Sequence, residues 1–334
     1  MAVVSMSSGI GTVSPKAPHG GFMPGRLHWA RTTRAGGKVG IGEAMALGSA
    51  AAWAVGVILA RQLGAHLPPL TLNLLKNGLV LAVLAPVAWL VYAGEWPALP
   101  ARDIAVVLAS GVIGIALADT LYFRALNELG AGRMGIIGNL YSPLVLLLGF
   151  VFLDERLGGM QWLGFGLVAM GVLLVSRPPG EWRTHPEHTA RGVLLGLLAI
   201  ALMAVAIVMV KRTLETQPLL WVTVLRLVGA VIGLLLVATL PAMRRRMRFV
   251  AGNVPWHRLV LAALIGQGLS MVMWLGGYKY TSASVAAILN ESASVFLVVL
   301  AALWLREPLG RRAGVGVLLT FSGIACMLLG RATP

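Results

Sequence analysis

The chain has 334 residues, of which 58% are hydrophobic and only 12% are charged, and its formal net charge is +15. Soluble domains carry about 25% charged residues, so this composition excludes a soluble enzyme built around one large core. Lys and Arg lie mainly in the N-terminal region and in short segments between apolar runs. This distribution is typical of contact with lipid headgroups. We therefore predict a helical membrane protein whose partners include the lipid bilayer and exclude nucleic acid.

Residues 1–41 differ in composition from the rest of the chain. They are rich in Gly, Ser and Pro, and they contain five basic residues and no acidic residue. The continuous apolar core of a signal peptide is missing from them. We expect a basic, disordered N-terminal tail, and a targeting segment is the alternative interpretation.

Ten apolar segments follow, each close to the roughly 20 residues that a helix needs to cross the hydrocarbon layer. They cover residues 43–61, 70–92, 103–123, 132–153, 159–176, 192–211, 218–241, 257–278, 284–305 and 312–330. A longer polar linker, residues 177–191, separates the first five segments from the last five. The expected organisation is therefore one five-helix unit over residues 42–176 and a second over residues 192–330.

The two groups of five segments repeat one another. A shift of 152 residues aligns identical residues along both: Ser142 with Ser294, Glu155 with Glu307, Gly164 with Gly316 and Gly171 with Gly323. A shift of 150 residues aligns Lys76 with Arg226. Because each half has an odd number of spans, the second half enters the membrane from the opposite side. The predicted fold is an all-α membrane protein of ten transmembrane helices in two inverted five-helix repeats.

Inverted repeats are typical of transporters, in which the substrate site lies near the middle of the membrane between the halves. A duplicated scaffold without a transport role is the alternative. Small residues at helical spacing allow close packing of helices in lipid. That packing can occur within one monomer or between monomers, so both oligomeric arrangements stay open.

Several motifs carry a family resemblance. They are NLYSPLV at 139–145, FLDERLG at 152–158 and GFGLVAMGV at 164–172, with second copies LREPLG at 305–310 and GVGVLLTFSG at 314–323. With these motifs, residues 43–330 resemble the drug/metabolite transporter superfamily, and within it the EamA-like family of ten-span exporters. The resemblance implies efflux of small metabolites or toxic compounds across the inner (plasma) membrane, with both termini cytoplasmic.

The resemblance also bears on single residues. The family's glutamate between the fourth and fifth spans of each repeat matches Glu155 and Glu307, and its basic residue in the second span matches Lys76 and Arg226. Many members carry a glutamate before the proline of the fourth-span motif, where this chain has Ser142. The sequence departs from the family pattern at that position.

Glu291 and Asn290 interrupt the apolar stretch of residues 286–299. An acidic residue at the centre of a membrane helix costs about 2.5–3.5 kcal/mol and usually faces a bundle interior or a watery cavity. Glu291 aligns with Asn139 under the 152-residue shift. We expect Asn290, Glu291 and Asn139 to contact substrate, or Glu291 to carry a proton. An internal ion pair between Glu291 and Lys76 or Arg226 is the structural alternative.

Lys76 and Arg226 lie several residues inside the second span of each half. We predict that they face the cavity and attract an anionic group, such as the carboxylate of an amino acid. Snorkelling of their long side chains to the interface is the alternative. Asn73 lies one turn before Lys76 and shares its face.

Weaker candidates for lining the cavity are aromatic or amide side chains within the predicted spans: Trp53, Tyr122, Tyr141, Gln267 and Trp274. Aromatic residues can hold a cation, but they are also common at membrane interfaces. Asp119 lies near the end of the third predicted span, where water can reach it. For Glu155 and Glu307 we expect a structural role, accepting hydrogen bonds from the N-terminus of the next helix.

No catalytic, nucleotide-binding or metal-binding motif rises above the background of the sequence. We therefore expect no enzyme activity, no cofactor and no metal. The leading hypothesis is a secondary transporter that exports a small metabolite, an amino acid or similar compound, by alternating access. Multidrug or toxic-cation efflux is the first alternative, and translocation of a lipid-linked substrate is the second. Proton coupling through Glu291 and purely facilitated export both fit the sequence.

Overall fold

The computed structural model describes residues 40–61, 63, 67–93, 96–129, 137–176, 186–241, 247, 254–304 and 311–330. Nearly all of the predicted tail, residues 177–185 of the predicted linker, and Glu307 lie outside these ranges. The helices belong to one unit, residues 37–334.

The described part of the chain is helical and contains no β-strand. Its α-helices are α1 (Ile41–Arg61), α2 (Pro69–Tyr92), α3 (Ala101–Gly111), α4 (Ala118–Leu129), α6 (Tyr141–Leu153), α7 (Gly159–Ser176), α8 (Pro186–Thr216), α9 (Leu219–Thr239), α11 (Trp256–Leu261), α12 (Ser270–Tyr280), α13 (Ala283–Asn290), α14 (Ala293–Trp304) and α15 (Arg311–Leu329). Two π-helical segments, η1 (Val112–Leu117) and η3 (Ala262–Leu269), join α3 to α4 and α11 to α12.

The protein is a multi-pass membrane protein. Five described segments are long and apolar enough to cross a bilayer: Leu70–Tyr92, Ala101–Tyr122, Ala190–Thr216, Leu219–Thr239 and Trp256–Tyr280. Large apolar side chains on the outside of the helices, such as Leu90, Phe152 and Leu236, are 60–67% exposed. A surface of this kind is stable in contact with lipid. The predicted total of ten spans stays a prediction.

Several helix bounds differ from the sequence prediction. Helix α8 begins at Pro186, so residues 186–191 of the predicted linker are helical. Proline suits the first turn of a helix because its missing N–H has no partner there. Helix α4 continues to Leu129, past the predicted end of the third span at residue 123. Polar residues such as Asn127 and Glu128 marked the end of the apolar run, but they do not end the helix.

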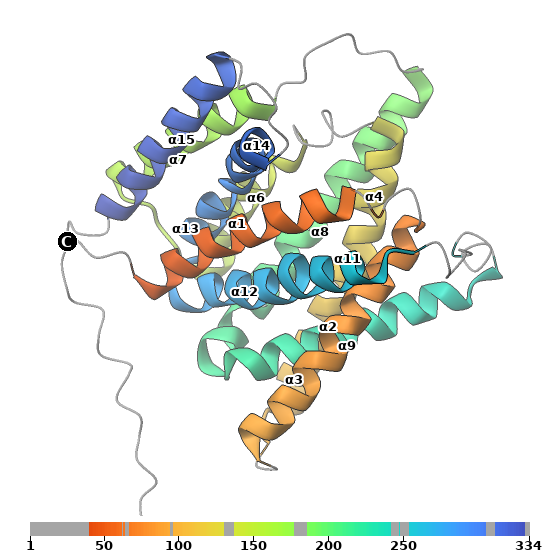
Figure 1. The fold of residues 1–334 in the computed structure, drawn as a ribbon. Helices are drawn as coiled ribbons and strands as arrows, with labels where there is room; N and C mark the ends of the chain where they lie inside the picture. The colour runs from red at the N-terminus through yellow and green to blue at the C-terminus, as the bar shows by residue number, and fades with distance from the viewer. Residues whose placement is uncertain are drawn as a thin grey trace, which may run out of the picture. The chain divides into compact units, whose positions relative to one another are not determined.

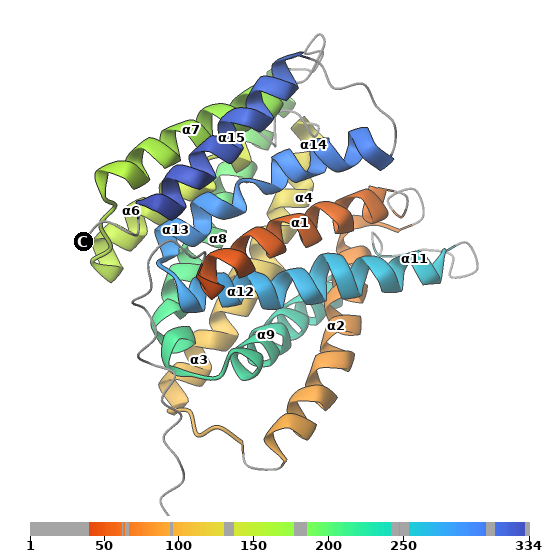
Figure 2. The ribbon, with the colours of Figure 1, turned by 60° about the vertical axis from the view of Figure 1, so that its left-hand side comes forward.

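Helices α7 and α15 lie side by side along one edge of the bundle (Figures 1 and 2). Glycines make this close approach possible. A Cβ atom on Gly171 would lie 2.6 Å from the carbonyl oxygen of Gly316, and one on Gly164 would lie 2.8 Å from that of Gly323. Gly316 and Gly323 are the repeat equivalents of Gly164 and Gly171. The contacts are crossed: Gly171 faces the equivalent of Gly164, and Gly164 faces the equivalent of Gly171.

A similar close contact joins α1 to η3. A Cβ atom on Gly56 would collide with the Cα atom of Gly266. In the corresponding place between η1 and α8, a Cβ atom on Gly114 would lie 2.8 Å from the Cβ atom of Ala206. Gly114 aligns with Gly266 under the 152-residue shift, and Gly56 with Ala206 under the 150-residue shift. The two crossings thus use equivalent positions of the sequence repeat.

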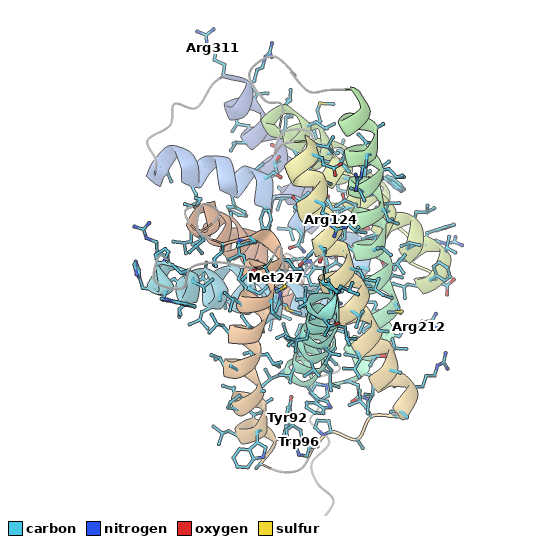
Figure 3. All side chains as sticks on the ribbon, turned by 90° about the vertical axis from the view of Figure 1, so that its right-hand side faces the viewer. Tyr92, Trp96, Arg124, Arg212, Met247 and Arg311 are labelled. Carbon is cyan, nitrogen blue, oxygen red and sulfur yellow. The ribbon has the colours of Figure 1, made fainter. Side chains whose placement is uncertain are left out.

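Aromatic side chains gather where α2 ends and α9 begins. The Trp221 ring lies 4.8 Å from the Trp96 ring and 6.4 Å from the Tyr92 ring, between centroids. Figure 3 shows Tyr92 and Trp96 together at this end of α2. Because Trp and Tyr are enriched where hydrocarbon meets headgroups, this cluster is consistent with a membrane boundary at the end of α2.

Candidate functional site

A chain of polar side chains runs between α2, η3 and η1 inside the bundle. The Lys76 ammonium donates to Gln267 Oε1 at 3.4 Å, and Gln267 Nε2 donates to Asn77 Oδ1 at 3.0 Å. Asn77 Nδ2 donates to Asn73 Oδ1 at 2.9 Å, and Asn73 Nδ2 donates to the Ile115 carbonyl at 3.4 Å. The structure therefore brings the predicted residues Asn73, Lys76 and Gln267 together, and it adds Asn77.

Each of the two π-helical segments supplies one member of this series of hydrogen bonds. Ile115 lies in η1 and Gln267 lies in η3, and the two residues align under the 152-residue shift. A π turn inserts a residue into an α-helix, and such turns occur frequently at functional sites. Here each π segment supplies an acceptor to an amide or ammonium group of α2: a backbone carbonyl from η1 and a side-chain oxygen from η3.

Arg226 enters the same region from α9 and is only 2% exposed. Its guanidinium lies 5.3 Å from the centre of the Trp274 ring. A Cβ atom on Gly114 would lie 2.8 Å from Arg226 Nη2, so the missing side chain of this glycine makes room for the guanidinium. Among the described residues, Nε and Nη1 of Arg226 have no hydrogen-bond acceptor. Buried donors without partners are rare, because each costs about 1–3 kcal/mol.

Asp119 lies in the first turn of α4 and interacts electrostatically with both Lys76 and Arg226. The sequence interpretation placed it at a wetted span end and did not select it. That interpretation rested on the end of the apolar run, whereas α4 continues for ten residues beyond Asp119 to Leu129. Asp119 still lies near the end of the apolar span Ala101–Tyr122, and its interaction with Lys76 of α2 and Arg226 of α9 makes it a candidate for the site.

Glu291 lies at a break between two helices of the second half. It occupies a turn with Ser292 between α13 and α14, and its Oε1 accepts a hydrogen bond of 3.2 Å from the Ser142 backbone N–H. Ser142 belongs to the first turn of α6, where the helix dipole favours a negative charge. The predicted span 284–305 is therefore interrupted at Glu291, and among the described residues the carboxylate has a backbone donor, not the ion pair that was the structural alternative.

Asn139 marks the matching break in the first half, in a turn with Leu140 just before α6. Pro143 explains this break, because a proline has no N–H to donate to the carbonyl four residues earlier. The Asn139 Nδ2 atom is buried and has no acceptor among the described residues. Asn290, in contrast, donates to the Ala286 carbonyl of its own helix at 2.8 Å.

Aromatic side chains pack together beside the polar groups of the site. The Tyr141 and Tyr278 hydroxyls lie 2.8 Å apart, and the Trp274 and Tyr278 rings lie 4.9 Å apart between centroids. Tyr122 and Tyr141 pack on the same group of buried apolar residues. Tyr278 was not selected in the sequence analysis. It lies among other aromatic residues, Trp274 and Tyr280, and the sequence alone does not distinguish it from them.

Trp53 lies on α1 one turn after Ser49, which contacts Ser270 of α12, and one turn before Gly56, which packs on Gly266 of η3. Its side chain is 42% exposed, and its place in the cavity stays a prediction. The described residues also contain no group of three or more His, Cys, Asp or Glu side chains placed to hold a metal ion. What the site offers is charge and hydrogen bonding: two cations, two carboxylates, amide groups and packed aromatic rings.

Comparison with known proteins gives the family. Residues 40–177 and residues 190–329 each match the EamA-like transporter family. The chain belongs to this family. These matches cover most of its length, and they agree with the predicted resemblance to the drug/metabolite transporter superfamily.

Individual relatives of this EamA-like protein are more distant. The threonine/homoserine exporter RhtA of Salmonella typhimurium LT2 is 31% identical over 143 residues, which are 41% of this chain and 46% of that protein. The uncharacterized transporter YwfM of Bacillus subtilis is 28% identical over 144 residues, 43% of this chain and 48% of that protein. The match thus spans about half the length of each of these relatives.

A solved crystal structure shares the fold. It superposes with a TM-score of 0.72 over 85% of this chain and 95% of the other, at 19% sequence identity. The fold seen here is therefore one that an experimentally determined protein adopts.

Proposed function

We propose that this protein is a secondary transporter of the inner membrane that exports an amino acid or a similar small zwitterion. Transport would proceed by alternating access between two inverted halves, residues 42–176 and residues 192–330, with both termini in the cytoplasm. Family membership and the repeat in the sequence support this proposal. The observation that carries it is the guanidinium of Arg226, buried between helices of both halves with two donors unpaired.

The unpaired donors favour a substrate carboxylate. Arg226 presents a planar set of N–H groups, a geometry that matches a carboxylate in two parallel hydrogen bonds. Asn139 Nδ2 is a further buried donor without an acceptor among the described residues. Lys76, the other cation, already donates to Gln267. A carboxylate bound at Arg226 would therefore satisfy groups that the described protein leaves without partners.

The charge balance of the site favours a substrate that also carries an ammonium group. Asp119 interacts electrostatically with both Lys76 and Arg226. Tyr141 interacts with Arg226 on one side and with Glu291 on the other, so the region holds charges of both signs. A site with both signs of charge suits a zwitterion better than a lipophilic cation, which would be repelled by Arg226. The RhtA relatives are named threonine/homoserine exporters, so threonine and homoserine are the first substrates to test.

The test is exchange of labelled threonine or homoserine by purified protein in proteoliposomes. We expect saturable exchange that unlabelled amino acids inhibit, while empty liposomes show none. Tetraphenylphosphonium serves as a lipophilic cation in a parallel experiment. Transport of this cation without amino-acid exchange would support multidrug efflux instead, and a lack of both activities across a pool of amino acids would contradict the proposed substrate class.

A first variant tests proton coupling. Glu291→Gln removes the negative charge but keeps an oxygen that can accept from the Ser142 N–H. If Glu291 carries the proton, a proton gradient directed opposite to the substrate flux accelerates export by the wild type. The variant still exchanges substrate, but its rate does not respond to the gradient. The control is Glu215→Gln, because the Glu215 side chain is 48% exposed and pairs within its own helix. Equal responses of wild type and Glu291→Gln to the gradient would exclude coupling through this residue.

A second variant tests the position of Arg226. Gly114→Ala places a methyl group 2.8 Å from Arg226 Nη2 and 2.8 Å from the Ala206 Cβ atom. Overpacking of this kind costs about 1–3 kcal/mol, so we expect a loss of roughly tenfold in apparent substrate affinity. Gly78→Ala is the matched control, because a Cβ atom there meets nothing within 4 Å. Unchanged affinity in Gly114→Ala would show that the guanidinium position does not limit binding.

A further inference from the structure

A polar hollow of about 380 Å³ opens at the end of the bundle where α6 and α8 end and α13 begins. Charged side chains dominate its lining: Glu155, Lys211, Arg212, Glu215 and Lys279. The sequence analysis selected only Glu155 among them, and as a structural residue. The proposed transport site does not use this hollow.

Most of these charges brace the end of α8. Lys279 donates to the carbonyls of Leu214, Glu215 and Gln217, at 2.6, 3.0 and 2.6 Å. Lys211 pairs with Glu215 on its own helix and donates to the Thr281 carbonyl at 3.1 Å. These contacts stay within the second half, so they hold its helix ends together without joining it to the first half.

Glu155 differs, because its carboxylate reaches from the first half to the second. Its Oε1 accepts from the Ala283 N–H at 2.6 Å, and its Oε2 accepts from the Ser284 N–H at 2.8 Å and the Ser284 hydroxyl at 2.7 Å. The expectation that Glu155 would bind the next helix in the chain is therefore wrong. It binds the first turn of α13, where N–H groups lack partners within the helix and attract an anion.

The local structure of the α6 end explains this direction. Asp154 ends the helix in the left-handed conformation with φ 56°, and the Glu155 N–H returns to the Gly149 carbonyl at 3.2 Å. Gly149 leaves space for the carboxylate, because a Cβ atom there would lie 3.1 Å from Glu155 Oε2. The chain reversal at Asp154 thus turns Glu155 back toward α13 and away from α7.

Helix α13 connects this contact to the proposed site. It runs for eight residues from Ala283 to Asn290, about 12 Å at 1.5 Å per residue, and Glu291 follows directly. A rigid shift of α13 along α6 would therefore also change where Glu291 meets the α6 N-terminus at Ser142.

We propose that the hollow is the closed mouth of the transport path on this face, and that Glu155 is the latch that closes it. This inference rests on the proposed function. In the opening step the carboxylate releases the Ala283 and Ser284 donors, α13 moves away from α6, and water and substrate enter through the hollow. Arg212, which donates to the Phe152 carbonyl at 2.9 Å, and Glu43, which accepts from the Thr281 hydroxyl at 3.0 Å, join the two halves beside the latch.

The test measures access to α13 with a membrane-impermeant thiol reagent. The native cysteine is first replaced by Cys326→Ser, and Ala286→Cys then places a reporter at a fully buried position of α13. Ser282→Cys, in the lining of the hollow, is the accessible reference. We expect Glu155→Gln to raise the labelling rate at position 286 about tenfold, the shift that loss of one hydrogen bond to a charged group produces, and to leave position 282 unchanged.

Two further variants sharpen the result. Ser284→Ala removes one of the three hydrogen bonds and should raise labelling at position 286 by a smaller factor. Glu215→Gln neutralises another carboxylate of the hollow, one that pairs within α8, and should have no effect. Equal labelling at position 286 in wild type and Glu155→Gln would overturn the latch, as would an equal increase in Glu215→Gln.

The labelling experiment is independent of the transported compound. If labelling responds to Glu155→Gln as expected but the protein exchanges no amino acid, only the proposed substrate class is rejected. Amino-acid exchange in a protein whose labelling ignores Glu155 would reject only the latch.

Discussion

Arg226→Lys will bind and export the amino acid much more weakly than the wild type, although the positive charge is kept. In the described site, the N–H groups at Nε and Nη1 of Arg226 have no hydrogen-bond acceptor. A lysine ammonium cannot present two N–H groups in that planar arrangement. It also lacks the planar group that lies 5.3 Å from the Trp274 ring. Hydrogen bonds to charged groups contribute about 1.5–3 kcal/mol each, so losing one lowers apparent affinity by roughly 10- to 150-fold.

The measurement is the concentration dependence of amino-acid exchange in proteoliposomes. A loss of binding raises KM, whereas a general folding defect lowers the amount of active protein and leaves KM unchanged. Arg311→Lys is the control, because Arg311 is exposed at the start of α15, outside the proposed site and the hollow. A wild-type KM in Arg226→Lys would show that the guanidinium does not hold the substrate.

Gly171→Ala will destabilise the folded protein, because α7 and α15 pack backbone against backbone at this position. The added Cβ atom would lie 2.6 Å from the Gly316 carbonyl oxygen and would also collide with the Thr320 hydroxyl. Backbone atoms cannot rotate away, so α7 and α15 must separate. Overpacking costs about 1–3 kcal/mol, and the separation also removes van der Waals contact along both helices.

Gly166→Ala is the matched control on the same helix. A Cβ atom there meets nothing within 4 Å, and alanine is about 1 kcal/mol better than glycine in a helix. We therefore expect Gly166→Ala to keep or raise the midpoint of thermal unfolding in detergent, and Gly171→Ala to lower it. Equal midpoints for the two variants would mean that α7 and α15 adjust to the methyl group without loss.

Sequence alone determined the class of protein and the main charged groups of the site. Apolar runs of about 20 residues predict membrane helices whatever their neighbours are, because the hydrocarbon layer accepts few alternatives. Lys76, Arg226 and Glu291 stood out for the same reason, since a charge inside such a run needs a partner or a cavity. The repeat was visible because glycines and charges recur at a fixed shift.

Only the tertiary structure decided which groups meet. Asp119 looked wetted in the sequence, and the structure shows that it interacts with Lys76 and Arg226, which come from two other helices. The helix breaks at Asn139 and Glu291, and the π segments η1 and η3, shift side chains around the helix axis in ways that an ideal period does not predict.

Glu155 shows the limit most directly. Its sequence predicts a carboxylate near a helix N-terminus, and that is what the structure contains. Every helix N-terminus offers the same unpaired N–H groups, so local chemistry cannot choose among them. The turn at Asp154 and the space at Gly149 are local and direct Glu155 back along α6. Only the packing of α6 against α13, which joins residues far apart in the chain, decides that the helix it meets is α13.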